Sequence, residues 1–270
     1  MTRIFLDGSL TGDAGASVGV GERTVVIPST IHTTRWGTLP LADDPAVAEV
    51  ASGTVLDMDT VSHEGILEDQ GRDPLGFFTA QGVGADQVLE DAIRIADESR
   101  HPEGSGPHVV TGPVRVVNAH VGDRLAVDVL SLKPRVPYGV ISNRHGKGVL
   151  VGDLPRNGQT TSIMAWWVMN GDRPCGLMRK FGSDAVETYH RVRGGGDPAI
   201  APHQGDADVV SFPLAPFLGI VGVTPSGDRR LSTVPPADLG GNIEIRLLVE
   251  GPRVYLPVFV DGVGLYTGLP

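Results

Sequence analysis

Histidine is the residue type whose placement in this chain points most directly to chemistry. His32 lies in the run IHTTRWG, and His63 lies in the run SHEG. A neutral imidazole is a good zinc ligand, and zinc lowers the pKa of a bound water to about 7. No two histidines are four residues apart, so a metal site has to be assembled from distant segments. We expect His32 and His63 to bind zinc or another divalent metal; the alternative for each is a histidine that only stabilises the fold.

Glu64 follows His63 directly and supplies a carboxylate for general acid–base chemistry. Neighbouring residues of an extended strand point to opposite faces, so both side chains reach one site only where the strand has ended. Gly65 permits such an end. Glu64 is therefore a candidate general base.

Cys175 is the single cysteine of the chain and an alternative nucleophile. As a thiolate it would be activated by Arg179 and Lys180, whereas a buried thiol would be inert. One cysteine cannot form a disulfide within the chain, which fits a reducing, cytoplasmic location.

Charge and hydropathy exclude several classes of protein. The 270 residues carry a formal net charge of −10, and no run of lysine and arginine exceeds two residues. Nucleic acids and anionic membranes attract clustered cations, so neither is an expected partner. No apolar run approaches the ~18 residues of a membrane helix, and the first residues lack the apolar core of a signal peptide. We expect a cytoplasmic protein.

The elements that must position these residues are mostly short strands. Glycine (37) and proline (21) are spread between short apolar runs, which indicates many turns. Ile163–Met169 fits either a buried strand or a short helix, and its two tryptophans favour the strand. One amphipathic helix is predicted at Asp86–Glu98, with Asp86 as its N-cap. The other predicted strands are Thr24–Pro28, Val114–Val117, Leu125–Leu132, Val209–Phe212, Phe217–Val223, Ile243–Leu248 and Val254–Val260.

A weak internal repeat is centred on Gly53, Gly122 and Gly251. Apolar residues recur at matching positions before and after each glycine, as in a strand, a tight turn and a second strand. Three such hairpins would build a mainly β sandwich or barrel, because one hairpin cannot bury its apolar face. We predict an N-terminal β subdomain at 1–135, with one helix near 86–98, and a C-terminal β subdomain at 136–270, packed as one unit.

Five segments of the chain are similar to the acetamidase/formamidase family. The GGN run within the fourth segment and the LPVFV run within the fifth, in that order, are the most specific of these matches. The segments are Thr111–Val114, Val121–Leu130, Pro213–Val223, Thr233–Asn242 and Tyr255–Val260.

The resemblance implies a β-sandwich or barrel-like fold with a small α+β element, and a homodimer or higher homo-oligomer. It also implies hydrolysis of small linear amides to a carboxylic acid and ammonia, with a metal-activated water as the favoured mechanism. Asn242 and Glu244 are then expected in the catalytic site, where Glu244 stands in place of the family's usual aspartate. Trp36 and His108 are expected to contact the substrate.

The sequence departs from the family pattern at its end. Family members continue past the segment that matches Leu265–Gly268 into a GD-x-H…GDGE block, which this sequence does not contain. An alternative function is therefore an inactive or truncated member that acts as a binding or structural β-sandwich protein. A cysteine amidase that uses Cys175 is a further alternative.

Overall fold

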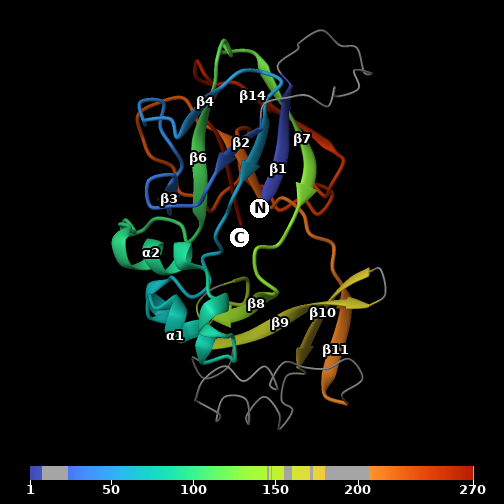
Figure 1. Cartoon of the computed structure of the whole chain (residues 1–270). Coiled ribbons are helices and arrows are strands. Elements are labelled where there is room, and N and C mark those ends of the chain that lie inside the picture. Colours follow the sequence, from blue (N-terminus) through green and yellow to red (C-terminus); the bar gives the residue numbers. More distant parts are fainter. Residues whose placement is uncertain are drawn as a thin grey trace. The chain divides into compact units, whose positions relative to one another are not determined.

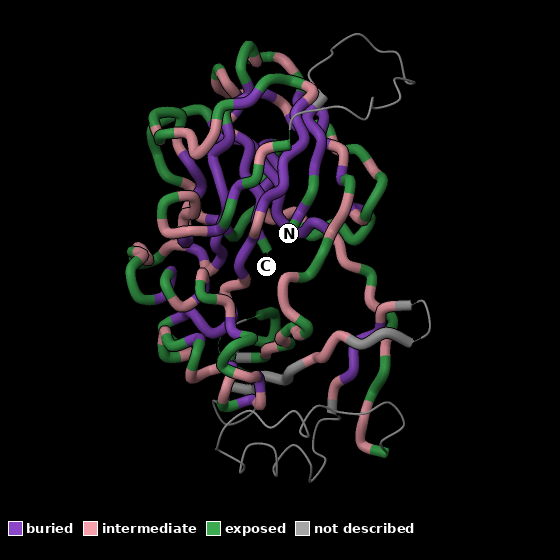
Figure 2. Tube along the Cα trace, viewed as in Figure 1, coloured by how far each residue is buried: buried purple, intermediate pink, exposed green. Residues whose placement is uncertain are grey.

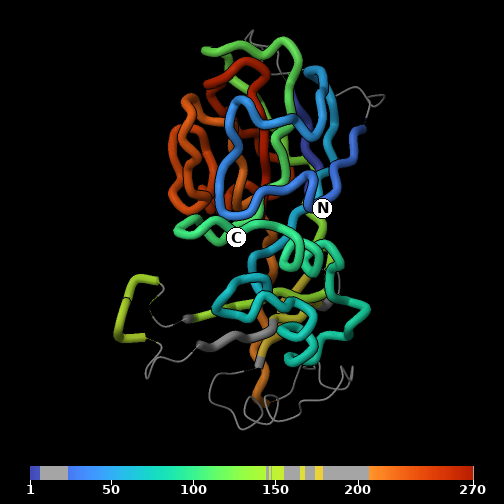
Figure 3. Tube along the Cα trace, turned by 90° about the vertical axis from the view of Figure 1, so that its left-hand side faces the viewer, coloured from blue at the N-terminus to red at the C-terminus, as the bar shows by residue number. Residues whose placement is uncertain are grey.

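The chain forms two compact units. The computed structural model describes residues 1–7, 24–144, 146, 148–154, 160–170, 173–179 and 207–269. The first unit comprises Met1–Arg72, Glu90–Pro134 and Pro216–Pro270, and the second comprises Asp73–Leu89 and Arg135–Ala215. The expected subdomain 136–270 is thus not a single unit, because its last strands pair with strands of the N-terminal half. Figures 1 and 3 show these orange-to-red strands beside green strands of the first unit.

A five-stranded sheet forms one layer of the first unit (Figure 1). Its strand order is β14-β7-β1-β5-β2, and only the pair β2–β5 is parallel. Its strands are β1 (Thr2–Asp7), β2 (Thr24–Ile27), β5 (Val55–Met58), β7 (Arg124–Leu132) and β14 (Arg253–Pro257).

A second sheet of the same unit contains strands from three of the five motif segments, Thr111–Val114, Pro213–Val223 and Thr233–Asn242. The order is β13-β12-β15-β6-β3, and β4 lies parallel to β6 off this path. Its strands are β3 (Thr34–Trp36), β4 (Ala48–Val50), β6 (Val109–Val116), β12 (Ile220–Val223), β13 (Gly240–Asn242) and β15 (Leu265–Leu269).

The two sheets share one apolar core. Ile4, Leu56 and Val127 of the first sheet are fully buried in the same cluster as Val110 and Ile220 of the second. Each such side chain contributes about 1.5–3 kcal/mol when it leaves water. Figure 2 shows the buried stretches concentrated in these strands. The predicted β sandwich is confirmed, and the described strands form open sheets without a closed barrel.

The repeated glycines form tight turns, but the predicted hairpins are wrong. Gly53, Gly122 and Gly251 all have positive φ, between 84° and 106°. The strands that flank the first two glycines pair in different sheets, so these turns cross from one layer to the other. No strand directly precedes Gly251, because the predicted strand Ile243–Leu248 is irregular, with a turn at Arg246 and Leu247. The strand after each glycine nevertheless joins the five-stranded sheet.

The predicted helix is correct in its last nine residues only. Helix α2 spans Glu90–Glu98 and buries Ala92, Ile95 and Ala96. Asp86 is not its N-cap, because it lies in a separate 3₁₀ helix, η2 (Ala85–Gln87), and the next residue, Val88, is extended. At nine residues, α2 is the longest helix that the structure describes, and no described helix is a candidate membrane span.

The second unit is the small α+β element. Its antiparallel sheet has the order β11-β10-β9-β8, and helix α1 spans Pro74–Thr79. Tyr138 packs on Phe78 and Trp166, with ring centroids 5.2 and 6.1 Å apart. The predicted strand Ile163–Met169 is confirmed inside β9. The strands are β8 (Tyr138–Arg144), β9 (Thr160–Asn170), β10 (Arg173–Arg179) and β11 (Val209–Pro213).

Candidate functional site

Three segments of the first unit meet where β3 ends and β6 begins. The carbonyl of Gly37 accepts hydrogen bonds from the backbone N–H of Gly106 (2.9 Å) and of Thr233 (3.1 Å). The Gly37 N–H donates to the carbonyl of His108 at 2.9 Å. Gly37 has φ +82°, and a Cβ there would lie 2.1 Å from Ser105 Oγ. Only glycine fits this junction, because both the backbone angle and the space exclude a side chain.

His63 and His108 face each other beside this junction. Their ring centroids are 5.2 Å apart, and the rings are inclined by 81°. His108 is 7% exposed, and its Nδ1 lies 3.2 Å from Thr233 Oγ1. Burial lowers the pKa of the His108 imidazole below its ordinary value of 6.5. His108 is therefore a neutral base at neutral pH.

The carboxylate of Glu64 lies beside the His63 ring of this histidine pair. Its Oε1 lies 3.6 Å from His63 Nε2, and the side chain is buried. Gln70 donates from Nε2 to Glu64 Oε2 at 2.5 Å, and its Oε1 accepts from the Gly65 N–H at 2.7 Å. Both side chains reach one place because β5 has ended at Met58 and Gly65 turns the chain with φ +85°. The strand has thus ended before His63, which is the condition under which the side chains of His63 and Glu64 can face one site.

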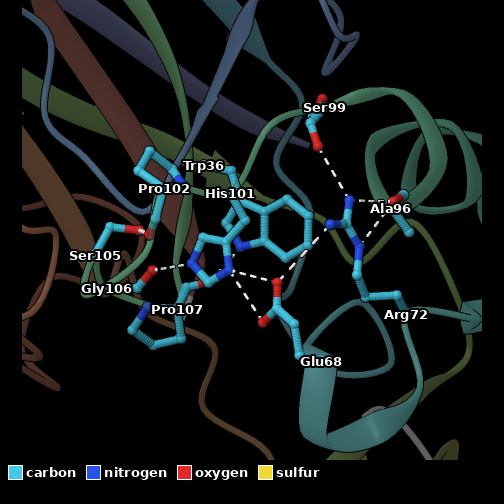
Figure 4. Close-up of polar contacts among 10 residues, drawn as sticks. All are labelled: Trp36, Glu68, Arg72, Ala96, Ser99, His101, Pro102, Ser105, Gly106 and Pro107. Carbon is cyan, nitrogen blue, oxygen red and sulfur yellow. Dashed lines mark hydrogen bonds and ion pairs between the residues drawn. The ribbon is translucent and has the colours of Figure 1, made fainter.

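The 3₁₀ helix η1 (Glu68–Gln70) carries Gln70 and is tied to the junction by His101 (Figure 4). The Nδ1 of His101 lies 2.9 Å from Glu68 Oε1, and its Nε2 lies 2.8 Å from the Gly106 carbonyl. The same ring stacks on Trp36, with centroids 4.4 Å apart and planes within 8°. His101 thus connects the turn that supports Glu64 to the segment that supports His108.

Arg72 connects the Trp36 ring to the end of helix α2. Its guanidinium carbon lies 4.9 Å from the centroid of the Trp36 ring, a distance at which a cation–π contact stabilises. Its Nη2 donates to the carbonyls of Ala96 and Ser99 at the end of α2, the latter at 3.0 Å. Trp36 is 4% exposed and donates its Nε1–H to the Pro107 carbonyl at 3.0 Å. These contacts hold the indole within the fold; its predicted contact with substrate stays a prediction.

Asn242, predicted in the catalytic site, reaches the histidine pair indirectly. Its Nδ2 donates to the Val234 carbonyl at 3.0 Å, and Val234 follows the Thr233 that contacts His108. The Oδ1 of Asn242 is buried and has no hydrogen-bond partner in the described part of the chain. Asn242 therefore supports the segment behind His108.

His32 and Glu244 are both exposed, whereas Glu64 and His108 of the cluster are buried. The turn places Glu244 at φ +48°, with its N–H bonded to the Gly219 carbonyl. Partial burial raises the pKa of the Glu244 carboxyl.

The described residues do not fit a zinc site. His32 and His63 lie in different surroundings, and within the described ranges no group of three or more His, Cys, Asp or Glu side chains could hold a metal ion. Structural and catalytic zinc sites in proteins use at least three protein ligands. His145 and His203 lie outside the described residues.

Cys175 lies in β10 of the second unit, and its thiol is buried. Lys180, proposed to activate it, lies outside the described residues. Burial of the thiol favours the alternative of an inert core residue.

Sequence reasoning missed the residues that position the cluster. Thr233 stands at the start of a motif segment and could have been suspected on that ground. Gln70, Glu68, Arg72 and His101 carry no motif, and only their contacts reveal them.

Comparison with known proteins shows where the chain is similar. The Acetamidase/Formamidase family model matches residues 85–232 and 227–269. An acetamidase of Mycolicibacterium smegmatis is 28% identical over 206 residues, which are 64% of this chain and 49% of that protein. A formamidase of Methylophilus methylotrophus is 26% identical over 201 residues, 64% of this chain and 47% of that protein. The chain thus spans about half the length of these relatives.

Solved structures of similar fold cover most of the chain. The crystal structure of an acetamidase from Bacillus halodurans has a TM-score of 0.56 at 20% identity and covers 90% of this chain and 61% of that chain. A gamma lactamase from Delftia acidovorans has a TM-score of 0.52 at 19% identity and covers 88% of this chain and 57% of that one. At such identities the likeness shows the fold. The family model matches well over half of the residues, and the chain belongs to the Acetamidase/Formamidase family.

Proposed function

We propose that the chain hydrolyses the carbon–nitrogen bond of small linear amides at the cluster of His63, Glu64 and His108. One observation carries the proposal: a buried neutral imidazole lies against a second imidazole that has a carboxylate 3.6 Å away. The acetamidase and formamidase relatives act on amides of this class by their names. Formamide and acetamide are therefore the substrates to test first.

The arrangement supplies a base and a proton donor. His108 takes a proton from water, and the hydroxide adds to the amide carbonyl. His63, which has Glu64 beside it, gives a proton to the amide nitrogen, and the proton that His108 took from water then returns to His63. The C–N bond then breaks, and the products are the carboxylic acid and ammonia. Water and the amide supply all the atoms of the products.

The burial of the site favours small substrates. His108 and Glu64 are 7% and 8% exposed, so little open surface leads to the reacting groups. A formyl or acetyl amide needs little room, whereas a long acyl chain would need the packed segments to separate.

The predicted zinc stays a prediction, and no step above uses a metal. Its test is the metal content of the purified chain by mass spectrometry, together with activity before and after a chelator. Stoichiometric zinc whose removal abolishes ammonia release would show that ligands other than the described cluster take part.

A homo-oligomer is also proposed. Val149, Leu150 and Val151 of the second unit are 99%, 55% and 67% exposed, and adjacent apolar side chains of this kind favour association. Light scattering after size exclusion measures the mass, and a monomer at micromolar concentration would contradict the proposal. The cytoplasmic location and the lack of nucleic-acid binding stay predictions.

Ammonia release from formamide and acetamide by the purified chain tests the function directly. We expect His63→Asn and Glu64→Gln each to lower kcat about 100-fold or more, the effect of losing general acid–base catalysis. Cys175→Ala is the matched control and should retain activity; a loss there would favour the cysteine amidase. A folded wild-type chain that releases no ammonia from either amide would favour the non-catalytic alternative.

A further inference from the structure

We propose that Gln70 is a positioning residue that fixes the carboxylate of Glu64, so that one oxygen is presented to His63 and the other is occupied. Glu64 then acts through His63 and does not itself take a proton from water. The consequence for activity rests on the function proposed above, whereas the contact between the two side chains does not depend on any activity.

The partners of the Gln70 side-chain amide fix its orientation. The backbone N–H of Gly65 can only donate, so the group that lies 2.7 Å from it is the carbonyl oxygen Oε1. The amide nitrogen Nε2 therefore faces the other way and donates to Glu64 Oε2 at 2.5 Å. A flipped amide would place two donors against each other. The orientation thus follows from the hydrogen-bond donors alone.

The two oxygens of the Glu64 carboxylate consequently face different groups. Oε2 accepts the hydrogen bond from Gln70, whereas Oε1 lies 3.6 Å from His63 Nε2. Glu64 is 8% exposed, and a buried carboxylate is stable only where donors or a counter-charge compensate for the lost water. The terminal torsion of glutamate is broad, so without Gln70 the carboxylate plane could turn away from His63.

This arrangement gives Glu64 a role different from that of a general base. A base that acts on water needs an oxygen directed at the water, whereas both oxygens of Glu64 are directed at protein groups. A carboxylate held beside an imidazole orients the ring, and this ring is the proton donor of the proposed reaction. Gln70 thus acts on the reaction through two side chains in sequence.

The backbone that carries the Gln70 side chain is itself fixed. Gln70 is the last residue of η1, and its backbone N–H donates to the carbonyl of Leu67 at 3.0 Å. Leu67 is buried, and His101 holds Glu68 at the first residue of the same turn. The amide of Gln70 therefore has little freedom to leave the carboxylate.

A double-mutant cycle on ammonia release tests whether Gln70 acts through Glu64. Gln70→Met removes a hydrogen bond to a charged group, so we expect kcat to fall about tenfold with little change in KM. In the Glu64→Gln background the same change should lower kcat less than about twofold further, because the group that Gln70 positions is already lost. Losses that multiply in the double variant would show a general structural role and overturn the inference.

Gln87→Met is the matched control for this cycle. Gln87 also ends a 3₁₀ helix and accepts from a backbone N–H, that of Gly84 at 3.4 Å. We expect Gln87→Met to keep the wild-type kcat. A loss as large as that of Gln70→Met would count against a specific role of Gln70.

Exchange of the two side chains tests the contact without any activity. Gln70→Glu keeps the acceptor for Gly65 but places a second carboxylate against Glu64, so we expect a lower urea midpoint than in the wild type. Adding Glu64→Gln restores a donor opposite an acceptor and should recover most of the lost midpoint. If Gln70→Glu does not fold, a folded double variant is that recovery, and its absence would overturn the inference. Recovery together with a folded wild type that releases no ammonia would refute the proposed function alone.

Discussion

Glycine plays two different roles in the two parts of the sandwich unit. At the turns between strands, Gly53, Gly122 and Gly251 have positive φ, and a Cβ added to any of them would meet nothing within 4 Å. At the junction beside the histidines, a Cβ on Gly37 or Gly106 would lie 2.1 or 2.3 Å from its nearest atom. The turn glycines are required by the backbone angle alone, whereas at the junction close packing also excludes a side chain. The junction is thus built to hold side chains in fixed positions.

Substitution at Gly37 should have the largest effect on stability. Gly37→Ala adds a strained left-handed φ of ~1–2 kcal/mol to overpacking of ~1–3 kcal/mol, so we expect a loss of about 3 kcal/mol in the free energy of unfolding. Urea denaturation followed by circular dichroism measures it. A loss below that of Gly53→Ala would contradict the distinction between turn and junction.

Gly106→Ala should have an intermediate effect on stability. The new methyl group would displace the Thr233 hydroxyl, at about 1–2 kcal/mol of overpacking. Because Thr233 Oγ1 contacts His108, ammonia release should also decrease. Urea denaturation measures the loss of stability, and wild-type ammonia release by a destabilised Gly106→Ala would show that packing, and not the position of His108, is affected.

Gly53→Ala should have a smaller effect. Only the left-handed φ of +84° opposes the substitution, so we expect about 1 kcal/mol. Gly53→Asn should cost less, because asparagine tolerates this region. Thermal melts of the two variants rank them, and equal losses would show that space, and not the backbone angle, limits this turn.

The smallest effect should be a pH dependence of stability carried by His108. Burial lowers its pKa in the folded state below 6.5, so between the two values the unfolded chain binds more protons. Stability from the neutral imidazole is complete above pH 6.5 and decreases as the pH falls toward the folded-state pKa. The difference in unfolding free energy between wild type and His108→Gln should therefore shift against the wild type on acidification. A difference that is constant from pH 8 to 5 would contradict the burial of a neutral ring.

Parts of the fold could be predicted from local patterns. The alternating pattern of Leu125–Leu132 correctly predicted β7, and the apolar run Ile163–Met169 correctly predicted part of β9. The pattern failed at Ile243–Leu248, where Leu248 is buried but Leu247 is 70% exposed in a turn. The hairpins also failed, since a glycine turn looks the same whether its strands pair with each other or join different sheets.

The sequence alone determined the residue types of the site and the family motifs, because both can be recognised from the order of residues along the chain. Which histidines meet was decided by the tertiary structure. His63 and His108 are brought together by the strand pairing of the sandwich, whereas His32, closer to His63 in sequence than His108 is, stays on the surface. Contacts between distant segments depend on how whole sheets pack, and no local pattern encodes that choice. For the same reason Thr233 became visible as a partner of His108 only in three dimensions.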